Sequence, residues 1–292
     1  MSMQLLINGL ALGSVYALIS VGFALIFNVL KFSNFSHGGV MVICAYTGYL
    51  ITTNFKTNLF VTLLLSAIVG GLLAMGIELI GFRRLRKSNK EVVLYFVSTV
   101  TISTLLGNLM TIFFSSTFYS YPKFFNDPYF KFLGVNVAKT DAMMLVISIA
   151  AILGLLFIVY RTRLGISIRA ISMDTKTTSL MGINTTLIIS ATFFVAGVFG
   201  GLSGVFLGIN YILSPQLGNL VVKGYIASVL GGLGDISGAV IGAVLLGLIE
   251  SMLISVDFIG AGLAPAVIFL ILMLFMFLRP QGITGKSVID KA

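Results

Sequence analysis

The sequence is poor in charge, cysteine, histidine and tryptophan. Only 9% of its 292 residues are charged, whereas 58% are hydrophobic, and an ordinary soluble domain carries roughly 25% charged residues. A water-soluble fold of this length could not hide so much apolar surface. The excess must face lipid, or other helices within lipid, which excludes an ordinary soluble globular domain.

Cysteine and histidine occur once each, as Cys44 and His37. A single cysteine excludes an intrachain disulfide and a cysteine metal cluster. Cys44 lies in an apolar run, where a small core residue is expected rather than a reactive thiol. With only one histidine, the chain cannot build a metal site from several histidines, and His37 is the one residue that could serve as the histidine of a catalytic triad. We therefore predict no catalytic residue, no metal and no cofactor bound by this chain.

Tryptophan is absent, and acidic residues are so few that the formal net charge is +9. A basic balance can indicate nucleic-acid binding. In a chain this apolar it is better explained by basic loops on the cytoplasmic side of a membrane, so no nucleic-acid partner is expected. No basic residue precedes the first apolar run, which is too long for a signal peptide; we expect it to be the first membrane helix.

Long uncharged runs dominate the chain, and a membrane-spanning helix needs about 20 apolar residues. The runs cover residues 1–30, 32–55, 57–77, 92–122, 142–160, 177–222, 224–249 (interrupted only by Asp235) and 258–278. Residues 224–233 are too short to cross alone and are expected to belong to a broken or re-entrant helix. The prediction is an all-α, polytopic transmembrane helical bundle of eight or nine membrane segments, forming one domain over residues 1–292.

Most lysine and arginine residues gather in three places, residues 83–90, residues 161–176 and the tail after residue 278. Basic residues mark the cytoplasmic side, so we place all three regions there and the loop at 115–141 outside. Three spans before Arg83 would put the N-terminus outside. The expected location is the bacterial plasma (inner) membrane, as a multi-pass protein.

Glycines recur every four residues in two stretches. They are Gly200, Gly204 and Gly208 in the first, and Gly234, Gly238 and Gly242 in the second. In lipid, small residues allow the close backbone approach that holds helices together. We expect two flat ridges, which serve either as ordinary bundle packing or as sliding surfaces in a gating bundle.

Residues 161–185 form a basic connection that is long for so compact a chain. From Ser167 onward the spacing of apolar residues predicts a short amphipathic helix, with Gly182 as a suitable stop. Such a helix on the cytoplasmic face could dock in a groove of a partner protein. It could equally be a basic loop lying on anionic lipid, and both interpretations stay open on the residues alone.

A polar interruption, Asn-Phe-Ser-His-Gly-Gly at residues 34–39, separates two apolar runs. Irregular polar backbone at membrane depth is tolerated only where it is buried in protein or lines a cavity. A lone histidine is more often structural than a ligand, and no nearby carboxylate orients His37 for catalysis.

Acidic residues within the spans are scarce. Glu78 is expected to pair near Arg83 or reach the surface there, Glu250 is the one deep acid, and Asp235 is expected in a turn. Such sparse, unpaired charge argues against proton or sodium coupling, which uses several intramembrane carboxylates or ion sites at broken helices.

Several motifs in order resemble the membrane permease subunit of bacterial ABC importers for branched-chain amino acids, the LIV type. They are Asn8-Gly9 through Leu18, Asn34 to Gly38, Arg163-Leu164-Gly165 with Arg169-Ala170, Gly182-Ile183-Asn184, residues 196–204 and residues 229–242. Each motif is weak alone. Their order and spacing cover nearly the whole chain, and together they are specific.

The resemblance implies a permease subunit of an ATP-driven importer that moves branched-chain or related amino acids into the cytoplasm. Its partners would be two cytoplasmic ATPase subunits, a second permease subunit and an extracytoplasmic substrate-binding protein, and ATP would be used by those partners. The coupling element over residues 161–185 would include Arg163, Gly165, Arg169, Ala170 and Gly182. The translocation path would lie near Asn34, Ser36, His37 and Gly38, and Glu250 is a further candidate for it.

The chain departs from the commonest family pattern at Ser36, Gly39 and Asp235, which leaves the substrate open among amino acids, amides and urea. The alternative function is an ion-coupled secondary transporter of a small polar solute. An intramembrane enzyme would need paired acids or a nucleophile with a base, and a channel would need a feature such as a charged ring. Neither pattern is found in the sequence.

Overall fold

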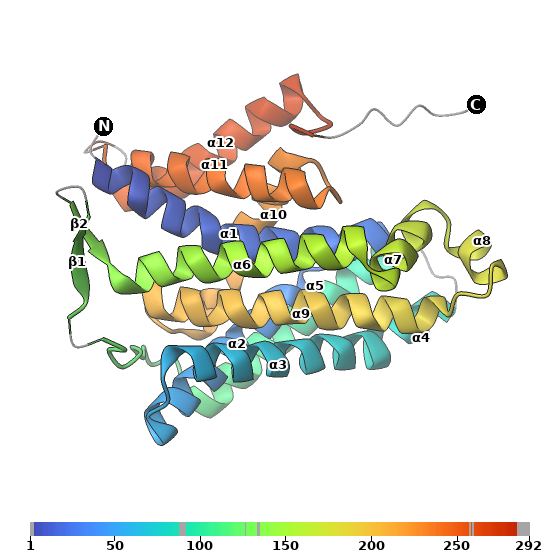
Figure 1. Ribbon diagram of the computed structural model, residues 1–292, viewed down its shortest axis with the longest axis horizontal. Helices are drawn as coiled ribbons and strands as arrows, with labels where there is room; N and C mark the ends of the chain where they lie inside the picture. The colour runs from blue at the N-terminus through green and yellow to red at the C-terminus, as the bar shows by residue number, and fades with distance from the viewer. Residues whose placement is uncertain are drawn as a thin grey trace.

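The computed structural model describes residues 3–87, 92–125, 127–132, 135–256, 258 and 260–284. The predicted all-α fold is confirmed within these ranges (Figure 1). The α-helices are α1 (Met3–Leu30), α2 (Ser36–Phe55), α3 (Leu59–Ile77), α4 (Arg83–Lys87), α5 (Val92–Phe114), α6 (Lys139–Arg161), α7 (Arg163–Met173), α8 (Thr175–Leu180), α9 (Thr185–Asn210), α10 (Val221–Gly231), α11 (Ile236–Ile254) and α12 (Gly260–Leu278). A π-helical turn η1 (Glu78–Phe82) joins α3 to α4, and a 3-10 helix η2 (Pro215–Leu220) precedes α10.

Seven helices in the described ranges are long and apolar enough to cross a membrane. Helices α4, α7 and α8 lie at one end of the bundle, whereas the start of α1 lies at the other (Figure 1). The end of α12 shares a pocket with Lys31 and Tyr160, which follow or close the helices that reach the same end. The predicted grouping of basic regions at one end therefore holds for their described residues; Ser88, Asn89, Lys90, Lys286 and Lys291 lie outside those residues. The distribution of lysine and arginine predicts that this basic end is the cytoplasmic end.

The outer loop carries a small hairpin that the sequence did not predict. Strand β1 (Tyr129–Phe132) pairs antiparallel with β2 (Val135–Ala138), and the hairpin stands at the end of the bundle opposite α7 (Figure 1). Each strand has only four residues, so the alternation that marks a strand is too short to stand out in an aromatic-rich loop.

Helix α1 is central to the bundle and is largely buried, whereas α5 and α12 are mostly exposed. Its glycines allow α11 to approach closely: a Cβ at Gly13 would lie 2.9 Å from Val244 Cα, and a Cβ at Gly9 would lie 3.0 Å from Leu248 Cα. Lipid supplies no hydrophobic drive between helices, so this close backbone packing holds α1 to α11.

The predicted glycine ridge on α9 is confirmed, and it packs toward α2. A Cβ at Gly204 would press on the carbonyl of Met41, and one at Gly200 would lie 2.9 Å from the His37 ring. The second ridge is wrong at Gly234, which lies in the turn before α11 with a φ of 86°. A glycine is needed there because L-residues rarely adopt positive φ. Gly238 and Gly242 do pack closely, against α10.

Residues 211–231 form the broken crossing that the shortness of residues 224–233 predicted. The chain leaves α9 in an extended conformation at Tyr211 and Ser214, forms η2, and continues as α10. Gly218 of η2 contacts the first turn of α2, and Gly232 at the end of α10 shares a pocket with Asn28 and Lys31 at the cytoplasmic end. This segment thus crosses part of the membrane as irregular backbone and part as a short helix.

Candidate functional site

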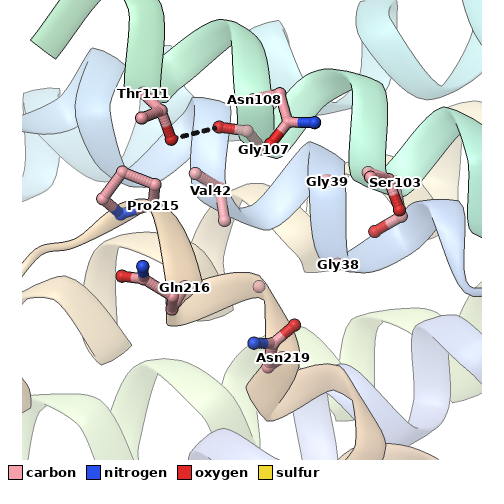
Figure 2. A pocket seen from close by; sticks show the side chains of 12 residues that line it. Gly38, Gly39, Val42, Ser103, Gly107, Asn108, Thr111, Pro215, Gln216 and Asn219 are labelled. Atoms are coloured by element: carbon pink, nitrogen blue, oxygen red, sulfur yellow. Dashed lines mark hydrogen bonds between the residues drawn. The ribbon is translucent and has the colours of Figure 1, made fainter. Parts of the chain in front are cut away.

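A polar cavity lies where α2, α5 and η2 meet. Its volume is about 220 Å³, and side chains from α5 and η2 stand on either side of it, with the first turn of α2 behind (Figure 2). The lining residues are Gly38, Gly39, Val42, Ser103, Thr104, Gly107, Asn108, Thr111, Pro215, Gln216, Gly218 and Asn219. None of these lining residues is charged, and hydroxyl and amide groups supply the polarity of the cavity.

The cavity exists because α2 begins inside the bundle rather than at its surface. A Cβ on Gly22 of α1 or Gly200 of α9, both well inside their helices, would lie 2.9 Å from the His37 ring. A Cβ on Gly39 would lie 3.2 Å from Ser103 Cα in the middle of α5. Helix starts with free N–H groups are expensive in lipid unless they are covered by protein or line a cavity.

Asn34 and Ser36 fix this helix start. The Asn34 Oδ1 atom accepts hydrogen bonds from Ser36 N at 3.2 Å and from Ser36 Oγ at 2.6 Å. Both residues are buried. Asn34 therefore satisfies the first backbone N–H of α2, as such residues commonly do at helix starts.

Glycines bring α2 and η2 into contact beside the cavity. A Cβ on Gly38 would lie 2.5 Å from the Gly218 carbonyl oxygen, and a Cβ on Gly218 would lie 2.8 Å from the Gly38 carbonyl oxygen. Any side chain at either position would force the two segments apart. These two glycines hold the irregular crossing against the start of α2, and they therefore set the width of the cavity.

Four polar side chains of the cavity are exposed in this chain, namely Thr104, Asn108, Gln216 and Asn219. Thr104 and Asn108 lie in the interior of α5, a helix apolar enough to cross the membrane. Polar groups facing hydrocarbon are costly, so polar side chains at membrane depth face a bundle interior or a water-filled space. The cavity-bearing face of α5 therefore does not face lipid.

The structure places the five predicted path residues in two groups. Gly38 lines the cavity, and Asn34, Ser36 and His37 are buried immediately behind it. Glu250 belongs to a separate cluster and is not among the cavity residues. The role of all five in translocation stays a prediction.

Glu250 is held by a lysine that the sequence analysis missed. Lys223 Nζ lies 2.5 Å from Glu250 Oε1 and 3.0 Å from the Tyr16 hydroxyl oxygen. The Tyr16 hydroxyl donates to Glu250 Oε2 at 3.0 Å and lies 3.1 Å from the Tyr211 hydroxyl. The cluster ties α10, which carries Lys223, to α1 and α11.

The expectation of unpaired intramembrane charge is therefore wrong for Glu250, which pairs with Lys223. The expected pairing of Glu78 near Arg83 is confirmed: Glu78 is fully buried against two arginines, with Arg86 at 2.9 Å and Arg83 at 3.5 Å. Both acids are neutralised because an uncompensated charge is costly inside a membrane. The partners could not be foreseen for Glu250, since they come from other helices.

The predicted coupling element forms a helical hairpin, α7 and α8, at the cytoplasmic end (Figure 1). Helix α7 begins at Arg163 rather than at Ser167, because the Thr162 hydroxyl accepts a hydrogen bond from Gly165 N at 3.3 Å and starts the helix earlier. Gly182, with a φ of 83°, ends the element as predicted. Ile168 and Ile171 are buried, so the predicted amphipathic packing is confirmed for them.

The two faces of this hairpin differ in exposure. Gly165 packs so tightly on the end of α6 that a Cβ would press on the carbonyl oxygens of Ile158 and Val159. Ala170 is half-buried, and Arg163 is exposed. The Arg169 guanidinium, also exposed, lies 5.6 Å from the centre of the Tyr160 ring. The outer face presents Met173, Leu180 and Met181, which are among the most exposed apolar residues described.

Asp174 joins the two helices of the hairpin. Its side chain accepts hydrogen bonds from the Thr177 hydroxyl and from Lys176 N, the latter at 2.9 Å. The Thr177 bond, more than the Lys176 bond, holds the pKa of this carboxyl below its usual value. The group therefore stays ionised at neutral pH and caps the start of α8 as a carboxylate. A helix start favours a negative charge.

The sequence did carry a signal for the α5 side of the cavity. Thr104, Asn108 and Thr111 recur at steps of four and three residues, which puts them along one side of a helix. A polar stripe on an otherwise apolar span is the pattern that marks a water-facing surface. Gln216 and Asn219 carry no such signal, because they lie in η2, a 3-10 helix too short to show a periodic pattern.

Comparison with known proteins identifies relatives over the full chain. A family model described as "Branched-chain amino acid transport system / permease component" matches residues 5–278. The chain is 30% identical to the high-affinity branched-chain amino acid transport system permease protein BraD of Pseudomonas aeruginosa, over 99% of this chain and 97% of the relative. It is 29% identical to the permease protein LivH of Escherichia coli K12, with the same coverage.

A more distant similarity extends to an archaeal protein. The chain is 26% identical to the probable branched-chain amino acid transport permease protein LivH of Methanocaldococcus jannaschii, over 93% of this chain and 89% of the relative. No solved structure matches the chain.

Proposed function

This chain belongs to the family of permease components of branched-chain amino acid transport systems, and from that premise we propose that its cavity between α2, α5 and η2 is part of the path for the substrate. The chain is the multi-pass, membrane-spanning permease subunit of an ABC importer in the plasma membrane. The observation that carries the proposal is the exposed polar face of α5 at membrane depth, which lipid cannot cover at low cost.

The proposed substrate is a branched-chain or related amino acid. Three matched relatives are named as branched-chain amino acid permease proteins. The cavity is lined by neutral amides, hydroxyls and glycine backbone rather than by an ionic clamp. A permease need not bind its substrate tightly when a separate binding protein selects it, and backbone groups at broken helices can still meet a zwitterion.

The proposed partners follow from the family. Membership implies ATPase subunits and a substrate-binding protein; we propose two ATPases in the cytoplasm, one second permease subunit facing α5, and one binding protein outside. ATP would be hydrolysed by the ATPases, and this chain would contribute no ATPase site and no cofactor. The α7–α8 hairpin would transmit ATPase closure to the bundle. The bundle would alternate between a state open to one side of the membrane and a state open to the other, and the ATPases can drive this change only if they bind the two states with different affinity.

The test is uptake of labelled leucine into proteoliposomes that contain this chain with its candidate ATPases, second permease and binding protein. We expect uptake that requires ATP and the binding protein and that stops when either ATPase is omitted. Uptake by this chain alone, driven by a proton or sodium gradient, would support the ion-coupled alternative instead.

The cavity makes a further prediction in the same assay. Asn108→Leu and Thr104→Val should each lower the uptake rate about two- to tenfold, because each removes a polar group that can replace substrate hydration, typically ~0.5–1.5 kcal/mol per hydrogen bond. Thr101→Val is the matched control, since Thr101 lies on the same helix but does not line the cavity. Wild-type uptake by both cavity variants would remove α5 from the path.

A further inference from the structure

A second, larger groove lies at the cytoplasmic end of the bundle, with Met75 of α3 and Arg83 of α4 on one side and the start of α9 on the other. Its volume is about 730 Å³. Asn184, Thr186 and Arg83 provide polar groups, and Leu187, Ala191 and Phe194 provide apolar ones. No acidic residue is among its lining residues. This groove is separate from the cavity beside α5, with which it shares no residue.

Polar residues line the cytoplasmic half of this groove down to Ser190, with Leu187 among them, and apolar residues line its deeper half. Helix α9 starts at Thr185 at the cytoplasmic end, so Asn184 and Thr186 lie at the membrane surface. Phe194 lies about 12 Å deeper along the same helix, at 1.5 Å per residue. The opposite wall follows the same order, with Arg83 near the surface and Met75 deeper along α3. A polar rim above an apolar slot matches the two parts of a phospholipid.

The rim carries a net positive charge. Arg83 Nη2 donates to Ser190 Oγ at 3.0 Å and lies 3.5 Å from Glu78 Oε2, and the Arg83 side chain remains 31% exposed. Glu78 is fully buried and also pairs with Arg86 at 2.9 Å. One carboxylate thus faces two guanidinium groups, which leaves one positive charge beside the groove.

We propose that this groove binds one anionic phospholipid of the cytoplasmic leaflet. Its phosphate would meet Arg83 and the polar groups at the start of α9, and one acyl chain would lie along Leu187, Ala191 and Phe194. Charge complementarity favours this occupant, because anionic lipids are concentrated in the cytoplasmic leaflet and basic pockets between membrane helices bind their headgroups. Leu164 of the α7–α8 hairpin also lines the groove, so the lipid would touch the coupling element.

The proposal is tested by native mass spectrometry of the intact importer complex, purified in detergent and mixed with dioleoyl phosphatidylglycerol or dioleoyl phosphatidylcholine. We expect preferential retention of phosphatidylglycerol. Arg83→Gln should weaken that retention roughly fivefold, the equivalent of about 1 kcal/mol for one cation near the membrane surface. Arg84→Gln is the matched control, since Arg84 is the adjacent exposed arginine and does not line the groove.

A second variant separates lipid binding from the ion pair with Glu78. Ala191→Phe fills the apolar slot without removing a charge, and it should also lower phosphatidylglycerol retention; Ala261→Phe, on the exposed part of α12, should not. Equal retention of the two lipids by the native complex would overturn the proposal. Equal losses of phosphatidylglycerol in Arg83→Gln and Arg84→Gln would overturn it too, as would unchanged retention in Ala191→Phe. If Arg83→Gln fails to assemble, the Ala191→Phe result alone decides between binding and no binding.

Discussion

Replacing Gly165 with leucine is expected to reduce ATP-driven uptake by about tenfold or more while the subunit still inserts in the membrane. A side chain at this position would press on the carbonyl oxygens of Ile158 and Val159 at the end of α6. It would push α7 away and disturb the Thr162 cap on Gly165 N. Overpacking of this kind costs ~1–3 kcal/mol, enough to move the hairpin out of its position for coupling.

Gly154→Leu is the matched control for that substitution. Gly154 lies on the adjoining helix, α6, and a Cβ there meets no atom within 4 Å. Uptake and ATPase activity should be measured in the same proteoliposomes. We expect Gly165→Leu to keep basal ATP hydrolysis but lose its stimulation by the binding protein. Wild-type uptake by Gly165→Leu would show that the packing of α7 on α6 is irrelevant to transport.

Replacing Lys223 with methionine should have the largest effect on the stability of the subunit. The substitution leaves the Glu250 carboxylate, which is 5% exposed, without its cation. Removing one partner of a buried ion pair typically costs about 3–5 kcal/mol, because the remaining charge is uncompensated. The broken crossing would lose its tie to α1 and α11, and with it the position of η2 beside the cavity.

The double variant Lys223→Met/Glu250→Gln tests whether the loss comes from the charge or from the residues themselves. We expect the double variant to recover most of the thermal stability and uptake that Lys223→Met loses, since the Tyr16 hydroxyl can still donate to the side-chain oxygen of the introduced amide. Thermal unfolding followed by size-exclusion chromatography measures the stability, and leucine uptake into proteoliposomes measures transport. If Glu250 were instead an ion-coupling carboxylate, stability would recover while uptake stayed lost.

The fold was largely predictable because lipid imposes a strong constraint on sequence. Runs of about 20 apolar residues correspond to membrane helices, and the shortness of residues 224–233 correctly indicated the broken crossing. Gly182 was identified as a helix stop because glycine, which has no Cβ, often ends helices by adopting positive φ, and Gly182 does adopt positive φ in the structure. The start of α7 was misplaced because the cap at Thr162 is a single hydroxyl, which the apolar pattern does not report.

The site was less predictable because it depends on which faces meet. The interruption at residues 34–39 was recognised as special, but its polar side chains are buried, Asn34 bonds to Ser36 at the start of α2, and Gly38 is the predicted path residue that lines the cavity. The polar stripe on α5 was overlooked within an apolar run. Lys223 separates two apolar runs in the sequence, and only the folding of α10 against α11 places it beside Glu250.

Cysteine cross-linking tests most directly whether the α7–α8 hairpin is the surface that the ATPase contacts. Cys44 is the one native cysteine and is buried, so a Cys44→Ala background is free of competing thiols. Met173→Cys, at a position 90% exposed on α7, should cross-link to a cysteine on the ATPase surface in the assembled importer. Tyr129→Cys, on the outer hairpin, should not. Absence of any cross-link from position 173, with one from position 129, would contradict both the orientation and the coupling role.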